Sequence, residues 1–471
     1  MSNSNQIVKN ILSMGTAELS AKGLAVIYTL YLISTIGPES NGALSFAKSI
    51  VQYFFIIVML GFDQAGIRDV ARNQALLPKY VGSILMLRIA LAILGYIGII
   101  ITTHIIDSFS PIADVTKRMI YIYGFLLFGQ ATLLTWVYMA VEKMHILAIR
   151  SLVLGILNLV GIMVFVKSES DVEIAIIIIT ISFMVNSIWM FIHYKSTFGK
   201  LSFSFDKSFI LSLFRQSFSI GLIFLIATMY NNIDITMLGI IKDERETGIF
   251  AAAHQLLAFL ILPTLILQGA FFPKFSRATN FEERDKVISI FSRINFLLGS
   301  FIALNLFLYS DLIVVLLGTQ YAESSGALKI LSVTIFLQYI VVNYFQPLIS
   351  WKYEDKVIKA TLIGLTLNVI VNMILIPIYG LYGAAIATIF SELSVLTMML
   401  ILFRKVHGNL YLPNLAKAFV ATLIGVSPGF VMLALGLNMY LSVIVTVTAC
   451  ILIYLYTKLV DFNEIRGYLK K

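Results

Sequence analysis

Residues 357–403 read VIKATLIGLTLNVIVNMILIPIYGLYGAAIATIFSELSVLTMMLILF, two long apolar runs joined by the short segment Pro-Ile-Tyr-Gly at 377–380. Each run reaches the length of about 20 residues that a helix needs to cross a hydrocarbon core about 30 Å thick. Lys359 and Glu392 are the only charged residues in the stretch. Inside a bilayer the backbone must satisfy its own hydrogen bonds, so the stretch predicts two transmembrane helices with a tight outer connection.

The same pattern recurs along the whole chain and predicts an all-α integral membrane protein. Of the 471 residues, 59% are hydrophobic and only 13% are charged, about half the charged share of a soluble domain. We expect about 14 transmembrane helices, and their predicted ranges are 14–36, 43–64, 80–104, 117–141, 145–166, 172–194, 209–240, 248–272, 287–309, 327–350, 357–378, 382–403, 414–435 and 438–458. The seventh range is too long for one crossing, so we expect residues 209–218 to lie in the interface.

The net charge of +9 is distributed as a topology signal. With the N-terminus placed inside, the inner connections hold about 22 Lys and Arg residues and the outer ones about 6, as the positive-inside rule requires. Both termini are therefore predicted to be cytoplasmic, and no nucleic-acid partner is expected. The longest outer connection, 310–326, leaves no room for a soluble enzymatic domain, and no GxxxxGK[ST] loop for ATP occurs.

Two hairpins indicate an internal repeat. Residues 36–48 (IGPESNGALSFAK) and 242–254 (KDERETGIFAAAH) align so that Gly42 matches Gly248 and Lys48 matches His254. Six spans separate them, which gives both halves one orientation and predicts a substrate path between the halves. The expected parts are an N-terminal lobe at 1–208, a C-terminal lobe at 209–408, and two further helices with a cytoplasmic tail at 409–471. A chance likeness between Gly-containing turns is the alternative.

Ionisable residues inside spans are the candidate functional residues, because each costs roughly 2.5–3.5 kcal/mol at a helix centre unless it is partnered or hydrated. Basic residues outnumber acidic ones, as an anionic ligand in a cavity would need. The candidate substrate-binding cations of the cavity are Lys48, Arg88, Lys22 and His254. Lys22 follows Glu18 by one helical turn, so an intrahelical ion pair is its structural alternative. His254 by itself would more often be a packing residue.

Other embedded charges have secondary interpretations. Three further cations, Arg150, Arg215 and Arg293, lie near the inner face, where such side chains can also snorkel to lipid phosphates. Two carboxyls, Asp234 and Glu392, are candidate sites for coupling transport to H⁺ or Na⁺. An ion pair with a neighbouring helix is the structural alternative for Asp234. No metal site and no other cofactor are expected.

Five stretches resemble the polysaccharide and O-antigen flippase family of the multidrug/oligosaccharidyl-lipid/polysaccharide exporter superfamily. They are IGPESNG (36–42), LGFDQAGIRDVAR (60–72), YNNIDITMLG (230–239), LLGTQYA (316–322) and NVIVNMILIPIYGLYGAAIAT (368–388). The resemblance implies two pseudo-symmetric six-helix lobes around a cavity, plus two C-terminal helices. It departs in one respect, because no Arg precedes the Gly-Pro-Glu turn at 37–39.

The resemblance also implies a function. The cargo would be an undecaprenyl-diphosphate-linked oligosaccharide, such as an O-antigen repeat unit, moved to the periplasmic leaflet of the bacterial inner membrane by alternating access. Its partners would be this cargo, membrane lipids, and the polysaccharide polymerase and chain-length proteins. Two rival functions stay open. A cation-coupled multidrug exporter should carry more acidic cavity residues, and a membrane-embedded polymerase or ligase should carry a larger outer loop.

Overall fold

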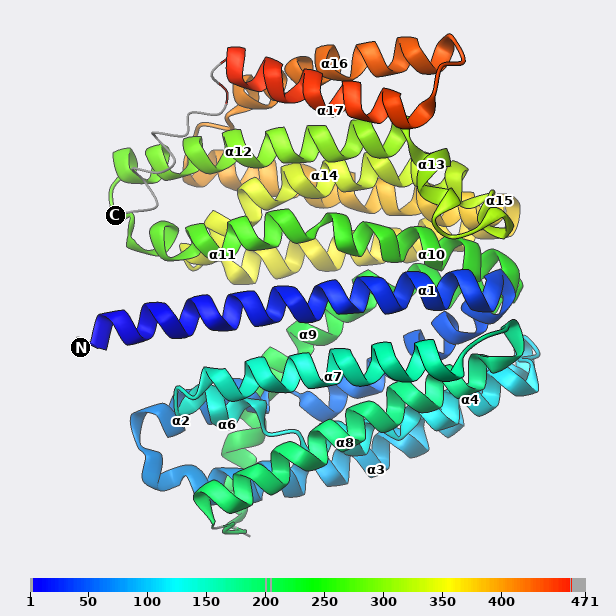
Figure 1. Ribbon diagram of the computed structural model, residues 1–471. Helices are drawn as coiled ribbons and strands as arrows, with labels where there is room; N and C mark the ends of the chain where they lie inside the picture. Colours follow the sequence, from blue (N-terminus) through cyan, green and yellow to red (C-terminus); the bar gives the residue numbers. More distant parts are fainter. Residues whose placement is uncertain (1–2, 200, 204–205, 458, 460–471) are drawn as a thin grey trace. The chain divides into compact units, whose positions relative to one another are not determined.

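The structure is a computed structural model that describes residues 3–199, 201–203, 206–457 and 459 (Figure 1). Throughout that part of the chain the regular secondary structure is helical, which confirms the predicted all-α class. The elements up to the middle of the chain are α1 (Asn3–Met59), α2 (Phe62–Arg72), η1 (Gln74–Leu76), α3 (Leu77–Phe109), α4 (Asp114–Gly124), α5 (Leu126–Thr132), α6 (Thr135–Ala140), α7 (Met144–Phe165), η2 (Glu169–Asp171), α8 (Val172–Phe198) and α9 (Lys207–Ile241).

The second half of the chain continues in the same way. Its elements are α10 (Glu244–Leu260), α11 (Leu262–Arg277), α12 (Phe281–Leu308), α13 (Ser310–Val315), η3 (Thr319–Tyr321), α14 (Ser324–Ser350), α15 (Glu354–Val406), α16 (Leu412–Ala434) and α17 (Met439–Tyr456). Most of the predicted cytoplasmic tail, residues 460–471, lies outside the described residues.

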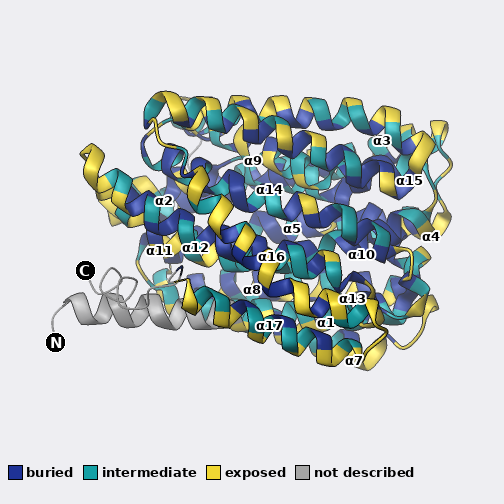
Figure 2. Ribbon diagram, turned by 90° about the horizontal axis from the view of Figure 1, so that it is seen from above, coloured by how far each residue is buried: buried dark blue, intermediate teal, exposed yellow. Residues whose placement is uncertain are grey.

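Among the described residues, twelve helical segments are long and apolar enough to cross a membrane. They expose large apolar side chains, for example Leu94 and Ile101 on α3 at 63% and 53%. Figure 2 shows such exposed residues alternating with buried ones along α3 and α17. Exposure of this kind suits lipid and not water, so the chain is a multi-pass membrane protein. The count of fourteen transmembrane helices stays a prediction. The two longest helices, α1 and α15, matter for this count because each contains a break.

Helix α15 folds back on itself at the predicted Pro-Ile-Tyr-Gly turn. Gly380 has φ 55° and ψ −132°, a backbone conformation that residues with a Cβ atom rarely adopt. A Cβ atom on Gly383 would lie 2.4 Å from the carbonyl oxygen of Leu375, although eight residues of straight helix span about 12 Å. The chain therefore reverses here and can cross the membrane twice, as its sequence predicts.

Helix α1 also reverses, at Gly37-Pro38. Gly37 has φ 74° and ψ 172°, outside the helical region. Tyr28, before the break, is hydrogen-bonded to Asn158. Gln52, after the break, lines the same cavity as Asn158. Twenty-four residues of straight helix would separate Tyr28 from Gln52 by about 36 Å, so both can approach Asn158 only if α1 forms a hairpin.

The chain divides into two compact units, Met1–Gly248 and Ile249–Lys471. In the first, α1 is central and packs on α3, α4, α7 and α9. In the second, α12 lies between α14 and α16, α14 pairs with α15, and α16 pairs with α17. The predicted lobes at 1–208, 209–408 and 409–471 follow the repeat and not these contacts, so their boundaries stay predictions.

The two glycines aligned by the predicted repeat contact each other reciprocally. A Cβ on Gly42 would lie 1.7 Å from the carbonyl oxygen of Glu244, and a Cβ on Gly248 would lie 1.7 Å from that of Pro38. Each glycine thus meets the residue four positions before the other. Asn41 Nδ2 donates to the Gly248 carbonyl oxygen at 2.9 Å and fastens the contact. Self-complementary contact of this kind is expected of elements related by a two-fold axis.

Candidate functional site

The second pass of α1, the part that follows the reversal at Gly37-Pro38, packs along α9 as an antiparallel pair. A Cβ on Gly239 would lie 2.2 Å from the Phe46 ring, and one on Gly221 would lie 2.8 Å from the backbone of Leu60. Residue numbers that increase along α1 therefore meet residue numbers that decrease along α9. The two glycines let the backbones approach closely, as small residues do between membrane helices. This contact places the polar residues near the middle of both helices together.

A cluster of hydroxyl groups lies between α1 and α9. The Thr236 Oγ1 atom is 2.7 Å from the Tyr53 hydroxyl and 3.0 Å from Ser49 Oγ. Asp234 is on the same helix as Thr236, is only 3% exposed, and interacts electrostatically with Tyr53. The sequence indicated Asp234 but not the three hydroxyls, which we call the hydroxyl cluster. The signal that could have identified them is the presence of polar residues within two predicted spans, at Ser49, Gln52 and Tyr53 in one and at Asp234 and Thr236 in the other.

Lys48 immediately precedes the hydroxyl cluster on α1. Its side chain is half-buried, and no residue in the described part of the chain provides it with a hydrogen bond or a salt bridge. An ammonium group on a membrane helix needs an anion, water or polar atoms to offset its desolvation. Lys48 is thus a cation whose partner is not a side chain among the described residues.

Arg88 has the opposite environment. It is fully buried on α3, its Nη2 atom lies 2.7 Å from Asp63 Oδ1 on α2, and Nη1 donates to the Leu133 carbonyl oxygen at 3.2 Å. Only its Nε atom has no partner. The Asp63 carboxylate is therefore the counter-charge of this predicted cavity cation, and the pair ties α2 and α3 to the segment between α5 and α6.

The remaining predicted residues of the first unit occupy separate places. Arg150 on α7 donates from Nε to Asn186 Oδ1 on α8 at 3.0 Å, and Asn186 Nδ2 donates back to the Arg150 carbonyl oxygen at 3.0 Å. Arg215 is exposed near the beginning of α9. Lys22 is half-buried on the first pass of α1, and the side chain of its predicted partner Glu18 lies outside the described part. None of these three joins the hydroxyl cluster.

Three predicted residues lie in the second unit. His254 on α10 stacks on Phe250 with ring centroids 6.0 Å apart. Glu392 on α15 is 3% exposed and accepts a hydrogen bond from Gln338 Nε2 at 3.0 Å. Arg293 is half-buried on α12. The pairing of His254 with Lys48 stays a prediction. Among the described residues no group of three His, Cys, Asp or Glu side chains could hold a metal ion.

Long apolar helices, two reversing helix pairs and embedded polar groups define the class of protein as a polytopic membrane protein. Its relationships are more specific. The polysaccharide biosynthesis protein family matches residues 7–279, more than half of the chain, and the chain belongs to that family. The family resemblance predicted from the sequence is confirmed.

Similar proteins include two from well-separated organisms. A putative O-antigen transporter of Escherichia coli K12 is 23% identical over 415 residues, which cover 84% of this chain and 96% of the relative. A probable low-salt glycan biosynthesis flippase of Haloferax volcanii is 26% identical over 238 residues, about half of each chain. The first similarity extends over most of this chain and nearly all of the relative.

Solved structures confirm the fold. The lipid II flippase MurJ in an inward closed conformation superposes with a TM-score of 0.71 at 14% identity and covers 94% of this chain and 98% of its own. An inward-facing multidrug resistance MATE transporter of the MOP superfamily superposes with a TM-score of 0.68 at 16% identity, covering 84% and 98%. At such identities the likeness extends to the fold alone.

Proposed function

We propose that this chain is a flippase that moves a polyprenyl-diphosphate-linked oligosaccharide between the two leaflets of a membrane. Its family and its similarity to O-antigen transporters support this class of cargo. The observation at the level of residues that carries the proposal is Lys48, a half-buried cation on a membrane helix with no partner among the described side chains. A diphosphate would supply the missing anion, and charge-assisted hydrogen bonds to phosphate are among the stronger ones.

The hydroxyl cluster would assist Lys48. Ser49, Tyr53 and Thr236 offer hydroxyl groups that can donate to phosphate or sugar oxygens. Lys22 and His254 are further proposed contacts of the headgroup, and Arg150, Arg215 and Arg293 are proposed secondary cations. Arg88 receives a structural role in this proposal, because Asp63 already neutralises its charge.

The proposed transport follows alternating access from the cytoplasmic to the periplasmic leaflet of the bacterial inner membrane, with both termini in the cytoplasm. The distribution of Lys and Arg among the connections supports this orientation. The proposed cargo is an undecaprenyl-diphosphate-linked O-antigen or related repeat unit. Binding shifts the equilibrium between two states only through different affinities for them, so net flux needs product removal or an ion gradient. The buried carboxyls of Asp234 and Glu392 are the proposed H⁺ or Na⁺ sites.

The fold itself does not separate this proposal from drug export, because both a lipid flippase and a drug exporter share it. The family match and the embedded cations support glycolipid transport. Glycan polymerisation has less support, because the outer connections predicted from the sequence are short.

The test is the membrane sidedness of the lipid-linked oligosaccharide in cells that lack this chain. A glycan-modifying enzyme is added to right-side-out and to inverted vesicles, and the modified fraction is compared. We expect intact units to accumulate on the cytoplasmic face and to reach the outer face again after complementation. Units that reach the outer face normally but stay unpolymerised would refute the flippase and favour a role after translocation.

A further inference from the structure

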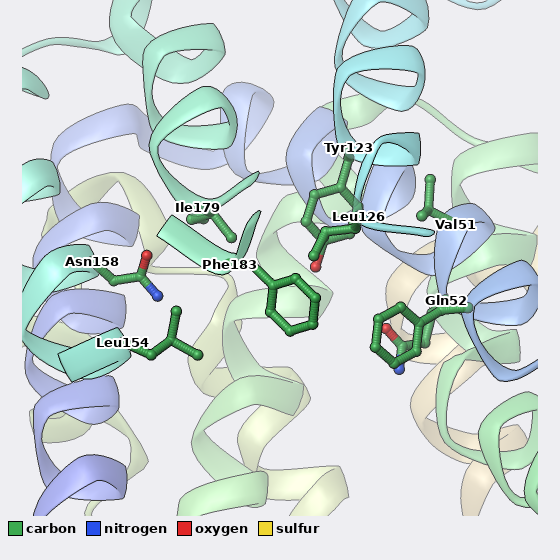
Figure 3. A pocket seen from close by; sticks show the side chains of 9 residues that line it. Val51, Gln52, Tyr123, Leu126, Leu154, Asn158, Ile179 and Phe183 are labelled. Carbon is green, nitrogen blue, oxygen red and sulfur yellow. The ribbon is translucent and has the colours of Figure 1, made fainter. Parts of the chain in front are cut away.

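The first unit contains a cavity that no charged residue lines. It has a volume of about 190 Å³ and lies between the second pass of α1 and helices α4, α5, α7 and α8. Its nine lining residues are six apolar ones and the neutral polar residues Gln52, Tyr123 and Asn158. Figure 3 shows the Asn158 and Gln52 amides on opposite sides, with the rings of Phe183 and Tyr123 between them.

The polar groups of this cavity have unused hydrogen-bonding capacity. Asn158 is 6% exposed, and its Oδ1 atom is buried without a partner. Tyr28 is hydrogen-bonded to the same amide and holds it in place. In the described part of the chain, the side chains of Gln52 and Tyr123 also have no hydrogen-bond partner. A buried polar atom left unsatisfied costs about 1–3 kcal/mol, and Asn158 Oδ1 is such an atom, whereas Gln52 and Tyr123 are half-buried. One buried unsatisfied oxygen, with two further polar side chains lining the same space, points to a ligand.

The chemistry of the lining selects the kind of ligand. Two amides and a phenol both donate and accept hydrogen bonds, which suits neighbouring hydroxyl groups, whereas a diphosphate would need cations. Aromatic walls from Phe55, Phe183 and Tyr123 offer flat apolar faces. An apolar cavity of about 150 Å³ accommodates one benzene ring, so a volume of 190 Å³ fits one substituted six-membered ring. A neutral pyranose combines this size with one hydroxyl-rich edge and one C–H face.

We infer that this cavity, defined by Gln52, Tyr123, Asn158, Phe55 and Phe183, binds one neutral sugar ring of the transported glycan and thereby selects the cargo. The inference rests on the proposed function and adds a site for the sugar to the site for the diphosphate. Gln52 lies one turn of α1 from Lys48, so a headgroup bound at Lys48 could present an adjoining sugar to the same helix.

The experiment measures binding of two lipids to the purified chain in nanodiscs. One is the lipid-linked oligosaccharide extracted from cells lacking this chain, and the other is undecaprenyl diphosphate without sugar. The variants are Tyr123→Phe and Gln52→Met, which remove polar atoms at nearly constant volume. Gln346→Met is the matched control, because Gln346 is equally half-buried but lies on α14, away from the cavity.

We expect each cavity variant to weaken binding of the glycosylated lipid about tenfold, the effect of one lost hydrogen bond in a desolvated site. Binding of undecaprenyl diphosphate should not change, and Gln346→Met should behave as wild type. Equal affinities of wild type and both cavity variants for the glycosylated lipid would overturn the sugar site, as would equal losses for both lipids. If wild type binds neither lipid, the proposed function itself fails. Asn158→Leu gives the third measurement should either variant not fold.

Discussion

Lys48 and Arg88 are both basic residues on membrane helices of the first unit. The sequence predicts the same role for both, that of a substrate-binding cation in the cavity. The structure separates them. Arg88 is 0% exposed and lies 2.7 Å from the Asp63 carboxylate, whereas Lys48 is half-buried with no such partner among the described residues. A cation that the protein neutralises holds helices together. One that the protein leaves unpaired is available to an anionic ligand, and the difference can be tested at each residue.

The largest expected effect is on stability at Arg88. Arg88→Met leaves Asp63 buried without its counter-charge, and breaking a buried pair in this way costs about 3–5 kcal/mol. We expect a strongly lowered Tm and aggregation in detergent, measured by thermal unfolding and size-exclusion chromatography. Removing the second charge as well, in Arg88→Met with Asp63→Leu, should recover most of the stability. A double variant no more stable than the single one would show that the pair is not what holds α2 on α3.

The second effect is on transport at Lys48. Lys48→Met removes the proposed diphosphate contact, and a hydrogen bond to a charged group contributes about 1.5–3 kcal/mol, or roughly 10–100-fold in flipping rate. The Tm should stay unchanged, because Lys48 forms no ion pair with a described residue. Lys48→Arg should retain most of the rate. The control is Lys329→Met, which removes an exposed cation that pairs with Asp311 at 3.2 Å. A wild-type flipping rate in Lys48→Met would refute the proposed contact between Lys48 and the diphosphate.

A smaller effect is expected in the hydroxyl cluster. Thr236→Val keeps the volume but leaves the Tyr53 hydroxyl without its partner at 2.7 Å, a loss of about 1 kcal/mol. Tyr53→Phe should lose a similar amount, and the double variant should lose less than the sum, because both changes break the same contact. Strict additivity in thermal unfolding would contradict a direct coupling between the two hydroxyls.

The smallest effect concerns a third kind of cation, whose charge depends on pH. His407 lies between α15 and α16, 6% exposed, with Nε2 2.8 Å from the Tyr411 hydroxyl and 3.5 Å from Asp285 Oδ1. Burial lowers its pKa below the ordinary 6.5, against the opposing effect of Asp285. The unfolded chain then binds the proton more readily, so the stability from His407 is present above about pH 6.5 and falls as the pH drops below it. We expect the Tm to decrease from pH 7 to pH 5, and to decrease less in His407→Phe. The same slope in both proteins would exclude His407 as the cause.

The fold was predictable from the sequence because its signals are local. Run lengths identify the spans, and the turns at Gly37-Pro38 and Gly380 appear as breaks between apolar runs. The internal repeat stays a prediction, although Gly42 and Gly248, which it aligns, lie in contact with each other's hairpins.

The site was only partly predictable, because its decisive features depend on distant residues. Asp63 and Arg88 are 25 positions apart with no helical spacing between them, so their pairing has no sequence signal. That no described side chain pairs with Lys48 depends on where every described carboxylate lies. Gln52, Tyr123 and Asn158 carry no charge, so a search for embedded charges passes over them, although neutral amides within predicted spans are a usable signal.

The most direct test of the contrast between the two cations is flipping of the lipid-linked oligosaccharide in proteoliposomes. Three proteins are compared at equal reconstituted amounts: wild type, Lys48→Met, and the charge-free pair Arg88→Met with Asp63→Leu. We expect Lys48→Met to lose about 10–100-fold in rate while remaining folded, and the double variant to flip within a few-fold of wild type. The reverse order, with Lys48→Met active and the folded double variant inactive, would refute Lys48 as the contact of the cargo and would assign that role to Arg88.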